Sequence, residues 1–273
     1  MICAYEMLTV LVIHEMDPEN SLAYQSLSKA LLLNNRKAQL FIYDNSSSPH
    51  TLPVNPLWTI TYQHDPSNPG VSRAYNQAFI AAKERDMQWM LFADQDTAFP
   101  ENIYERYTYA VTSHNDCDVF APHLIDSKGI ISPFHRGITS GKRLIQVVTG
   151  KKSILQYQAI NSGLLVSTHI FQAVGGYDER LRLDFSDFDF FNRLQQHSSN
   201  IVFLDSHCKH EHSSTMPTTQ DNAIDRFKIY LDAITIMQVG PFGFMFPVRA
   251  FLRALKLSFQ YRSFRFIGTY LLR

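Results

Sequence analysis

The chain of 273 residues has little cysteine and no long apolar run. Its three cysteines form no closely spaced pair, which favours a reducing compartment over a disulfide-stapled secreted scaffold. No window reaches the roughly 18 consecutive apolar residues that a membrane span needs. The N-terminal MICAYEMLTV lacks the basic start of a signal peptide. We therefore expect a cytoplasmic protein, unless it lies on a membrane surface.

Two common phosphate-binding motifs are also missing. The Gly-x-Gly-x-x-Gly of dinucleotide-binding proteins is absent, and so is the P-loop pattern, which argues against a dehydrogenase or a P-loop NTPase. Disorder is excluded for most of the chain, because apolar residues make up 45% of it and charged residues only 18%. The length predicts one large domain, or one domain with an appendage.

The chain has no net charge, but its charge is unevenly distributed. Residues 241–273 carry six Lys or Arg and no acid, so this tail is +6 and residues 1–240 are −6. The same tail holds seven phenylalanines. We therefore predict a catalytic domain over residues 1–240 and a basic, aromatic helical appendage over residues 241–273.

The hydrophobic pattern alternates between strand and helix. Strands are expected at 7–13, 39–43, 57–62, 88–93, 117–121, 161–167 and 201–204, and helices at 21–33, 71–86, 100–112, 187–197, 221–238 and 243–270. Asn20 is available as an N-cap of the first helix, and Pro100 lies near N1 of the third. The alternation predicts an α/β fold with a mostly parallel central sheet, helices on both faces and C-terminal amphipathic helices.

Polar side chains follow the buried strands, where α/β proteins bind ligands. Asp94 and Asp96 come directly after the strand at 88–93, and such hard oxygens suit Mg²⁺ or Mn²⁺. The alternative is a loop whose carboxylates cap the next helix. After another strand comes Gly70, which admits a tight turn, although an ordinary loop-to-helix junction would look the same.

A third acidic cluster surrounds the helix expected at 187–197. Asp187 shares a helical face with Phe190, Phe191 and Leu194, so its carboxylate should point toward the protein and could act as a general base. An N-cap on a core helix is the alternative. Further along, the run HCKHEH has no structural zinc spacing, and one histidine completing an oxygen-rich metal site is the better interpretation.

Taken in order, several segments resemble the inverting family 2 glycosyltransferases of the GT-A type, especially the rhamnosyltransferase-like bacterial members that build surface polysaccharide. The matching segments, from residue 8 to about 215, are VLVIHEMDPENSLAYQSL, FIYDNSS, NPGVSRAYNQAF, WMLFADQDTAFP, INSGLLVS, GGYDERLRLDFSDFDFFNRL and HEHS. Each segment alone is a weak signal, and their conserved order is what carries the resemblance.

The resemblance implies a role for each matching residue. Asp187, six residues before Arg193, would be the catalytic base, and Asp44 would contact the nucleotide base. The full set comprises Asp44, Asn45, Asn68, Gly70, Asn76 and Asp94 for the donor nucleotide, Asp96 and His210 for the metal with His212 as the rival histidine, and Asp184, Asp189 and Arg193 as acceptor or support residues.

The implied activity is transfer of a sugar, with inversion, from a nucleotide-diphosphate sugar to an acceptor hydroxyl. Mg²⁺ or Mn²⁺ would serve as cofactor, and a lipid-linked acceptor in O-antigen or capsule synthesis would be the partner. The alternative enzyme is a sugar-nucleotide nucleotidyltransferase. It would need a basic, Gly-rich phosphate-binding loop after the first strand, but the segment at that position, residues 14–18, is acidic. The other rival is a non-catalytic, membrane-recruited module of the same fold.

The basic tail has two interpretations. Val248, Leu252, Leu255 and Phe259 recur at helical spacing beside cationic residues, which predicts a helix lying on the inner leaflet of the cell membrane. Alternatively, the apolar residues pack on the catalytic domain or form a homodimer. The tail's composition would also suit nucleic acid, but we expect none, because its apolar residues fall in helical order.

Overall fold

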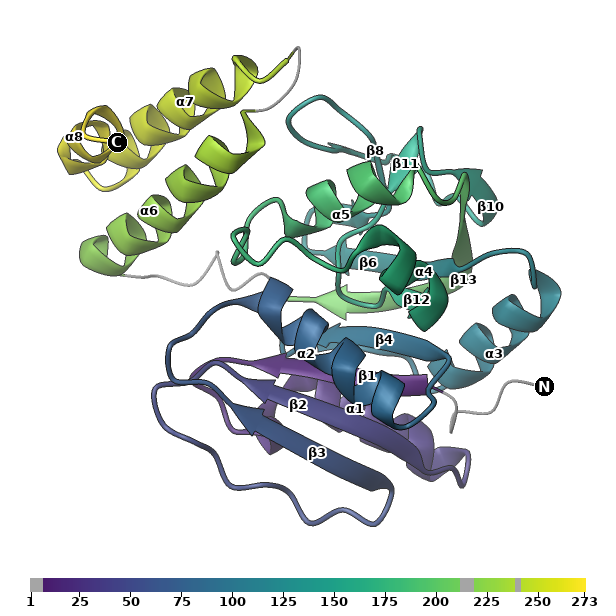
Figure 1. Cartoon of the computed structure of the whole chain (residues 1–273). Helices are drawn as coiled ribbons and strands as arrows, with labels where there is room; N and C mark the ends of the chain where they lie inside the picture. Colours follow the sequence, from purple (N-terminus) through teal and green to yellow (C-terminus); the bar gives the residue numbers. More distant parts are fainter. Residues whose placement is uncertain (1–6, 212–218, 239–241) are drawn as a thin grey trace.

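The computed structural model describes residues 7–211, 219–238 and 242–273, and Figure 1 shows their arrangement. The strands are β1 Met7–Ile13, β2 Ala38–Asp44, β3 Trp58–His64, β4 Trp89–Asp94, β5 Thr97–Ala98, β6 Val119–Asp126, β7 Gly129–Ser132, β8 Phe134–His135, β9 Lys142–Arg143, β10 Gly150–Ser153, β11 Tyr157–Gln158, β12 Leu165–Ser167 and β13 Asn200–His210. Within the described residues, ten of them form one sheet with the main order β10-β13-β6-β12-β4-β1-β2-β3, and β11-β8-β9 form a small second sheet.

The helices are α1 Leu22–Leu33, α2 Val71–Glu84, α3 Ile103–Ser113, α4 Thr168–Val174, α5 Ser186–Leu194, α6 Gln220–Met237, α7 Met245–Gln260 and α8 Arg265–Leu271, with a 3₁₀ turn at Pro18–Asn20. One face of the large sheet packs on α1 and α3, and the other on α2, α4 and α5. Covering both faces explains why β1 is buried at all seven positions and is apolar at nearly all of them.

The central strands are mostly parallel. β1 lies between β2 and β4 and is parallel to both, with Val10 opposite Phe41 on one side and Phe92 on the other. β13 is parallel to β6, whereas the short β12 runs antiparallel to both β4 and β6. The expected α/β fold, with a mostly parallel sheet covered on both faces, is confirmed.

Some local predictions were wrong at element ends. Ser21, not Asn20, caps α1: its hydroxyl accepts a hydrogen bond from the Tyr24 backbone nitrogen at 3.1 Å, while residues 18–20 form the 3₁₀ turn. Pro100 lies in a turn before α3, which begins three residues later. The pattern over 243–270 is two helices, because Arg262 takes a left-handed φ of 50° that ends α7.

The C-terminal helices have a core of their own. Phe227 of α6, Phe246 and Ala250 of α7 and Phe266 of α8 are buried together in a third hydrophobic cluster. α6 precedes the composition change near residue 241 yet packs in this cluster. In Figure 1 the three helices, in yellow-green and yellow, lie beside the sheet domain rather than on its sheet. No helix among the described residues is both long enough and apolar enough to cross a membrane.

Candidate active site

The carboxyl end of β2 positions Asp44. Its side chain is fully buried and accepts hydrogen bonds from the Ser46 backbone nitrogen at 2.8 Å and the Tyr62 hydroxyl at 2.6 Å, and it contacts His50 Nδ1 at 2.9 Å. Burial alone would raise the pKa of Asp44, but these hydrogen bonds outweigh it and lower the pKa. Asp44 is therefore a fixed anion that shapes the loop after β2.

The next residue, Asn45, is also buried, and its Oδ1 has no hydrogen-bond partner within the described part of the chain. A buried acceptor of this kind calls for a donor group from a ligand or a water molecule. Asp44 and Asn45 thus lie together at the end of β2, with one buried acceptor that the described residues leave unsatisfied.

Asp65 follows β3 at the same edge and was missed by the sequence analysis. Its carboxylate accepts hydrogen bonds from the Tyr43 hydroxyl at 3.0 Å and the Ser67 hydroxyl at 2.6 Å. The sequence contained a signal for Asp65, because it follows the expected strand at 57–62 by three residues, much as Asp94 follows the expected strand at 88–93.

The loop before α2 is held against the segment that precedes α5. Gly70 has φ 95°, and a Cβ there would lie 2.0 Å from the Arg182 carbonyl oxygen, so only glycine fits. The carbonyl oxygen of Asn68 accepts from the Arg182 guanidinium. The turn itself lies at residues 65–68, and Gly70 follows it as the N-cap of α2, at an ordinary loop-to-helix junction that also lets two backbone segments approach closely.

Asn76 joins α2 to the turn after α4. Its Nδ2 donates to the Tyr177 carbonyl oxygen at 2.9 Å, and its Oδ1 accepts from the Tyr177 backbone nitrogen at 2.9 Å. Both amide atoms are thus engaged by the protein. Its contact with a donor nucleotide stays a prediction.

Asp94 ends β4 in an environment that disfavours its charge. Burial, followed by the charge of Asp96, raises the pKa of Asp94 to about 7, although the Tyr75 hydroxyl donates to it at 3.1 Å. Asp187 adds a further repulsion. Carboxylates that crowd one another in this way favour either a proton or a cation between them. Tyr75, stacked on Phe92 at 4.2 Å between ring centroids, was not among the predicted site residues.

Asp96 and His210 are brought together by the pairing of β5 with β13. His210 Nδ1 lies 3.5 Å from Asp96 Oδ1 and 2.8 Å from the Thr97 hydroxyl. Within residues 7–211, 219–238 and 242–273, no three acidic, histidine or cysteine side chains cluster closely enough to hold a metal. Asp96 and His210 alone would supply two of the ligands that a divalent ion needs, so metal binding here stays a prediction. His212, the rival histidine, lies outside the described residues.

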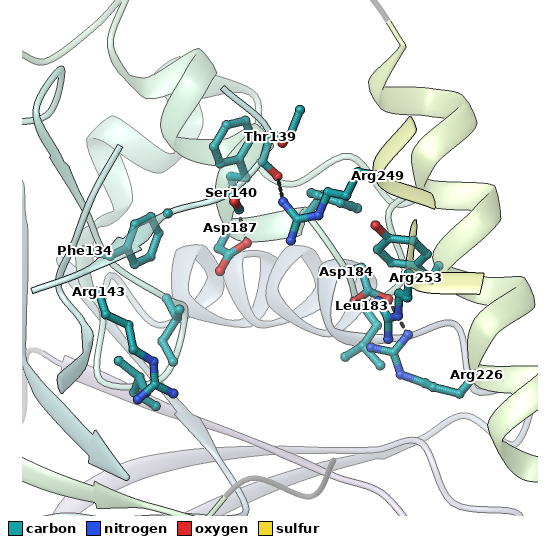
Figure 2. A pocket seen from close by; sticks show the side chains of 16 residues that line it. Phe134, Thr139, Ser140, Arg143, Leu183, Asp184, Asp187, Arg226, Arg249 and Arg253 are labelled. Carbon is teal, nitrogen blue, oxygen red and sulfur yellow. Dashed lines mark hydrogen bonds and ion pairs between the residues drawn. The ribbon is translucent and has the colours of Figure 1, made fainter. Parts of the chain in front are cut away.

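Asp187 lies in the first turn of α5 and faces a cavity of 550 Å³ (Figure 2). Burial raises its pKa to about 6, opposed by a hydrogen bond from the Phe188 backbone nitrogen at 2.7 Å and assisted by the charge of Asp184. Phe185, just before the helix, has φ 64°, a left-handed conformation that is unusual for an aromatic residue. Such strain is common at functional sites.

The other residues of this acidic segment have structural partners. Asp189 and Arg193 form the expected pair four residues apart, with Arg193 Nη2 2.7 Å from Asp189 Oδ2. Arg193 also donates to the Val174 and Gly176 carbonyl oxygens at 2.9 and 2.6 Å, so it fixes the turn after α4. Asp184 lines the cavity and is ion-paired with Arg226 of α6.

The cavity brings together stretches that are far apart in the chain. Its walls come from residues 131–143, 160 and 183–188 of the sheet domain and from the helices α6 and α7. Thr139, Ser140 and Arg143, from the stretch that follows β8, line the same cavity as Asp187 (Figure 2). Arg226, Arg249 and Arg253 were missed as site residues. The last two were interpreted from the sequence as membrane-facing cations, but they point into the cavity.

The fold is shared with solved structures of TarS from S. aureus, a GT-A-like glycosyltransferase. Its fragment 1–349 in complex with UDP matches with a TM-score of 0.54 at 12% identity, over 83% of this chain and 64% of that one. The same fragment with UDP-GlcNAc gives 0.52 at 13% identity, over 93% and 73%. At this identity the likeness shows the fold alone. No protein-family model and no curated protein sequence matches the chain.

Proposed function

We propose that this protein is an inverting, metal-dependent glycosyltransferase that uses a nucleotide-diphosphate-sugar donor. One observation carries the proposal: Asp96 and Asp187 both lie within electrostatic reach of Asp94, since the charge of each raises the pKa of Asp94. The fold that carries these carboxylates is similar to that of TarS, which has been solved in complex with UDP and with UDP-GlcNAc. The motifs resemble those of the rhamnosyltransferase-like members of family 2, and we propose that the chain belongs with them.

The mechanism follows from the position of Asp187. With a pKa of about 6, its carboxylate is largely ionised at neutral pH and still basic enough to take a proton. Asp187 would accept the proton of an acceptor hydroxyl as that oxygen attacks the anomeric carbon. The bond from that carbon to the diphosphate oxygen breaks on the opposite face, so one displacement inverts the configuration.

The strand-end residues would hold the leaving group. Asp96 and His210 would hold Mg²⁺ or Mn²⁺, and such an ion would supply positive charge to stabilise a diphosphate leaving group. Thr97 would orient the imidazole of His210 through its hydroxyl, which lies 2.8 Å from Nδ1. Asp44 and Asn45, at the neighbouring strand end, would frame the site of the nucleoside.

A donor screen tests this function. The purified chain, Mg²⁺ or Mn²⁺ and a panel of UDP-, dTDP- and GDP-sugars are incubated, and nucleoside diphosphate release is measured. We expect metal-dependent release from one nucleotide class, with Asp187→Asn strongly reduced and the exposed Asp205→Asn unchanged as the matched control. Release of pyrophosphate from a sugar phosphate and a nucleoside triphosphate would identify a nucleotidyltransferase instead. Binding without release would identify a non-catalytic module.

We further propose a lipid-linked glycan acceptor, such as one used for bacterial surface polysaccharide, and peripheral attachment to the inner leaflet. The support is the outer face of α7, where Val248, Leu252 and Phe259 are 56%, 59% and 89% exposed. Apolar side chains presented along one helix face suit the headgroup boundary of a bilayer.

Vesicle co-sedimentation tests the attachment. Deleting residues 241–273 would remove Phe246 and Phe266 from the core that they share with α6, so point variants are better. We expect the exposed pair Leu252→Asn and Phe259→Ser to lose binding to anionic vesicles while the melting temperature holds. If the unaltered chain does not bind anionic vesicles at low salt, the outer face of α7 is not a membrane surface. Its apolar side chains would then contact another protein, and a homodimer is the interpretation to test.

A further inference from the structure

The cavity in front of Asp187 is rich in guanidinium groups. Arg143, Arg226, Arg249 and Arg253 all line it, and three of these four come from the C-terminal helices. Figure 2 shows the side chains of α6 and α7 reaching toward the segment that carries Asp184 and Asp187. The C-terminal helices therefore supply charge to the catalytic cavity.

These cations are unequally compensated. The positive charge of Arg143 is compensated by Asp126, because the two terminal nitrogens of Arg143 donate to the two oxygens of Asp126 at 2.9 and 2.6 Å. Arg226 and Arg253 share a single carboxylate, that of Asp184, with Arg253 Nη1 3.8 Å from Oδ1. Two positive charges thus face one negative charge.

Arg249 adds to this surplus. Its contacts within the described residues are to the Thr139 carbonyl oxygen and to the ring of Phe185, whose centroid lies 5.6 Å from the guanidinium carbon. Both are neutral groups. The C-terminal helices thus contribute three guanidinium groups to the cavity lining, those of Arg226, Arg249 and Arg253, against the two carboxylates of Asp184 and Asp187, an excess of one positive charge.

Burial makes that surplus costly. Burial lowers the pKa of the Arg253 guanidinium, although neighbouring Asp184 acts in the opposite direction. A guanidinium presents a planar fork of donors that matches phosphate oxygens in a bidentate way. An anion entering the cavity would meet several such forks at once.

We propose that Arg226, Arg249 and Arg253 bind a phosphate-type anion carried by the acceptor, and so hold the acceptor hydroxyl beside Asp187. This inference rests on the proposed function and adds the chemical class of the acceptor: a phosphomonoester, phosphodiester or diphosphate. The donor diphosphate has its own place at the ends of β4 and β5, where Asp96 meets His210.

Calorimetry on the full chain tests the site. UDP and Mg²⁺ are first added to saturation, which fills the donor site, and inorganic phosphate or glycerol 2-phosphate is then titrated, with glycerol as the neutral control. We expect Arg249→Gln and Arg253→Gln each to weaken phosphate binding about tenfold or more, as loss of a hydrogen bond between charged groups implies. Arg249→Lys should recover part of the affinity.

Lys256→Gln is the matched control, because it removes the same charge from an exposed position on the same helix, outside the cavity lining. Its phosphate affinity should equal that of the unaltered chain. Equal phosphate affinity in all variants would overturn the proposal, and so would failure of the unaltered chain to bind phosphate. Circular dichroism confirms that each variant is folded, and Arg226→Gln replaces any that is not.

Two further measurements distinguish failure of the anion site from failure of the proposed function. If Arg249→Gln weakens UDP binding instead of phosphate binding, the arginines serve the donor and the acceptor assignment falls. If the unaltered chain binds phosphate but releases no nucleoside diphosphate from any donor, the proposed function fails while the anion site stands. Vesicles with and without phosphatidic acid identify the source: Arg-dependent vesicle binding indicates a lipid headgroup, and its absence indicates a phosphate on the soluble part of the acceptor.

Discussion

The two sides of the candidate active site are built in different ways. On the donor side, Asp44, Asp94 and Asp96 stand directly after buried strands, and a parallel sheet brings such strand ends to one edge. The acceptor side is assembled from the segments 131–143 and 183–188 and from helices that begin at residues 220 and 245. Each donor-side carboxylate is marked by the strand just before it in the chain, whereas no local pattern marks the arginine residues of the acceptor side.

The two sides also differ in charge. Donor-side carboxylates crowd one another, so that burial and the charge of Asp96 raise the pKa of Asp94 to about 7. The acceptor-side cavity carries the opposite surplus, with guanidinium groups that outnumber their carboxylate partners. The donor side is therefore suited to a cation, and the acceptor side to an anion.

Removing a donor-side carboxylate should have the largest effect. We expect Asp96→Ala to reduce transfer by about 10³-fold or more, because several kcal/mol of transition-state stabilisation depend on the metal. Nucleoside diphosphate release with and without Mn²⁺ measures the effect, and chelation should reproduce it in the unaltered chain. Asp205→Ala, an exposed aspartate on β13, is the control. Near-normal transfer by Asp96→Ala would show that this residue holds no metal.

Removing the acceptor-side base should spare the donor side. Asp187→Asn keeps the shape and removes the proton acceptor, so we expect kcat to fall by ~10²–10⁴-fold. UDP affinity, measured by calorimetry, should change little, since Asp187 lines the cavity while the nucleoside is framed by Asp44 and Asn45 at the end of β2. Loss of UDP affinity with kcat retained would reverse the two roles.

The pH dependence should separate the two sides. The base must be ionised to act, and the pKa of Asp187 is raised to about 6, so the rate should be lost as the pH falls through about 6. A proton on Asp94 would remove a negative charge beside the proposed metal ligand Asp96, and the pKa of Asp94 is raised to about 7, so metal affinity should already weaken as the pH falls through about 7. Rates at saturating Mn²⁺, and Mn²⁺ titrations at each pH, measure the two midpoints. A single common midpoint would contradict the division.

The sequence placed the strand-end carboxylates correctly because the signals for them are short-range. An unbroken apolar run followed by a carboxylate marks both the strand and its functional end, as for β4 and Asp94. Asp187 was predictable for a similar reason, since the apolar stripe of its own helix indicates which way it faces. The predicted elements differ from the structure mainly at their ends, where Ser21 replaces Asn20 as the cap.

The acceptor side was not predictable in the same way. Arg249 and Arg253 lie beside an exposed apolar stripe, a pattern that is typical of a membrane-surface helix. Only the packing of α7 with α6 turns these two side chains toward Asp184 and Phe185, more than 60 residues earlier in the chain. A helical pattern predicts which residues share a face, but it does not predict what that face meets.

The smallest effect is expected where the two sides touch. Gly70 belongs to the donor-side loop and Arg182 to the segment that leads to Asp187, and a Cβ on Gly70 would lie 2.0 Å from the Arg182 carbonyl oxygen. Gly70→Ala adds this clash to the strain of an alanine at φ 95°, so we expect it to lose about 1–3 kcal/mol of unfolding free energy. Denaturant unfolding measures the loss.

Gly129→Ala is the matched control for that substitution. Gly129 has a similar φ of 108°, but a Cβ there would meet nothing within 4 Å, so this variant carries the backbone strain without the clash. We expect Gly70→Ala to be the less stable of the two and to lower kcat as well, because relieving the clash moves the segment that carries Asp187. Equal stabilities would mean that the close approach does not constrain the structure. A larger loss with unchanged kcat would mean that the donor and acceptor sides are held in place independently of each other.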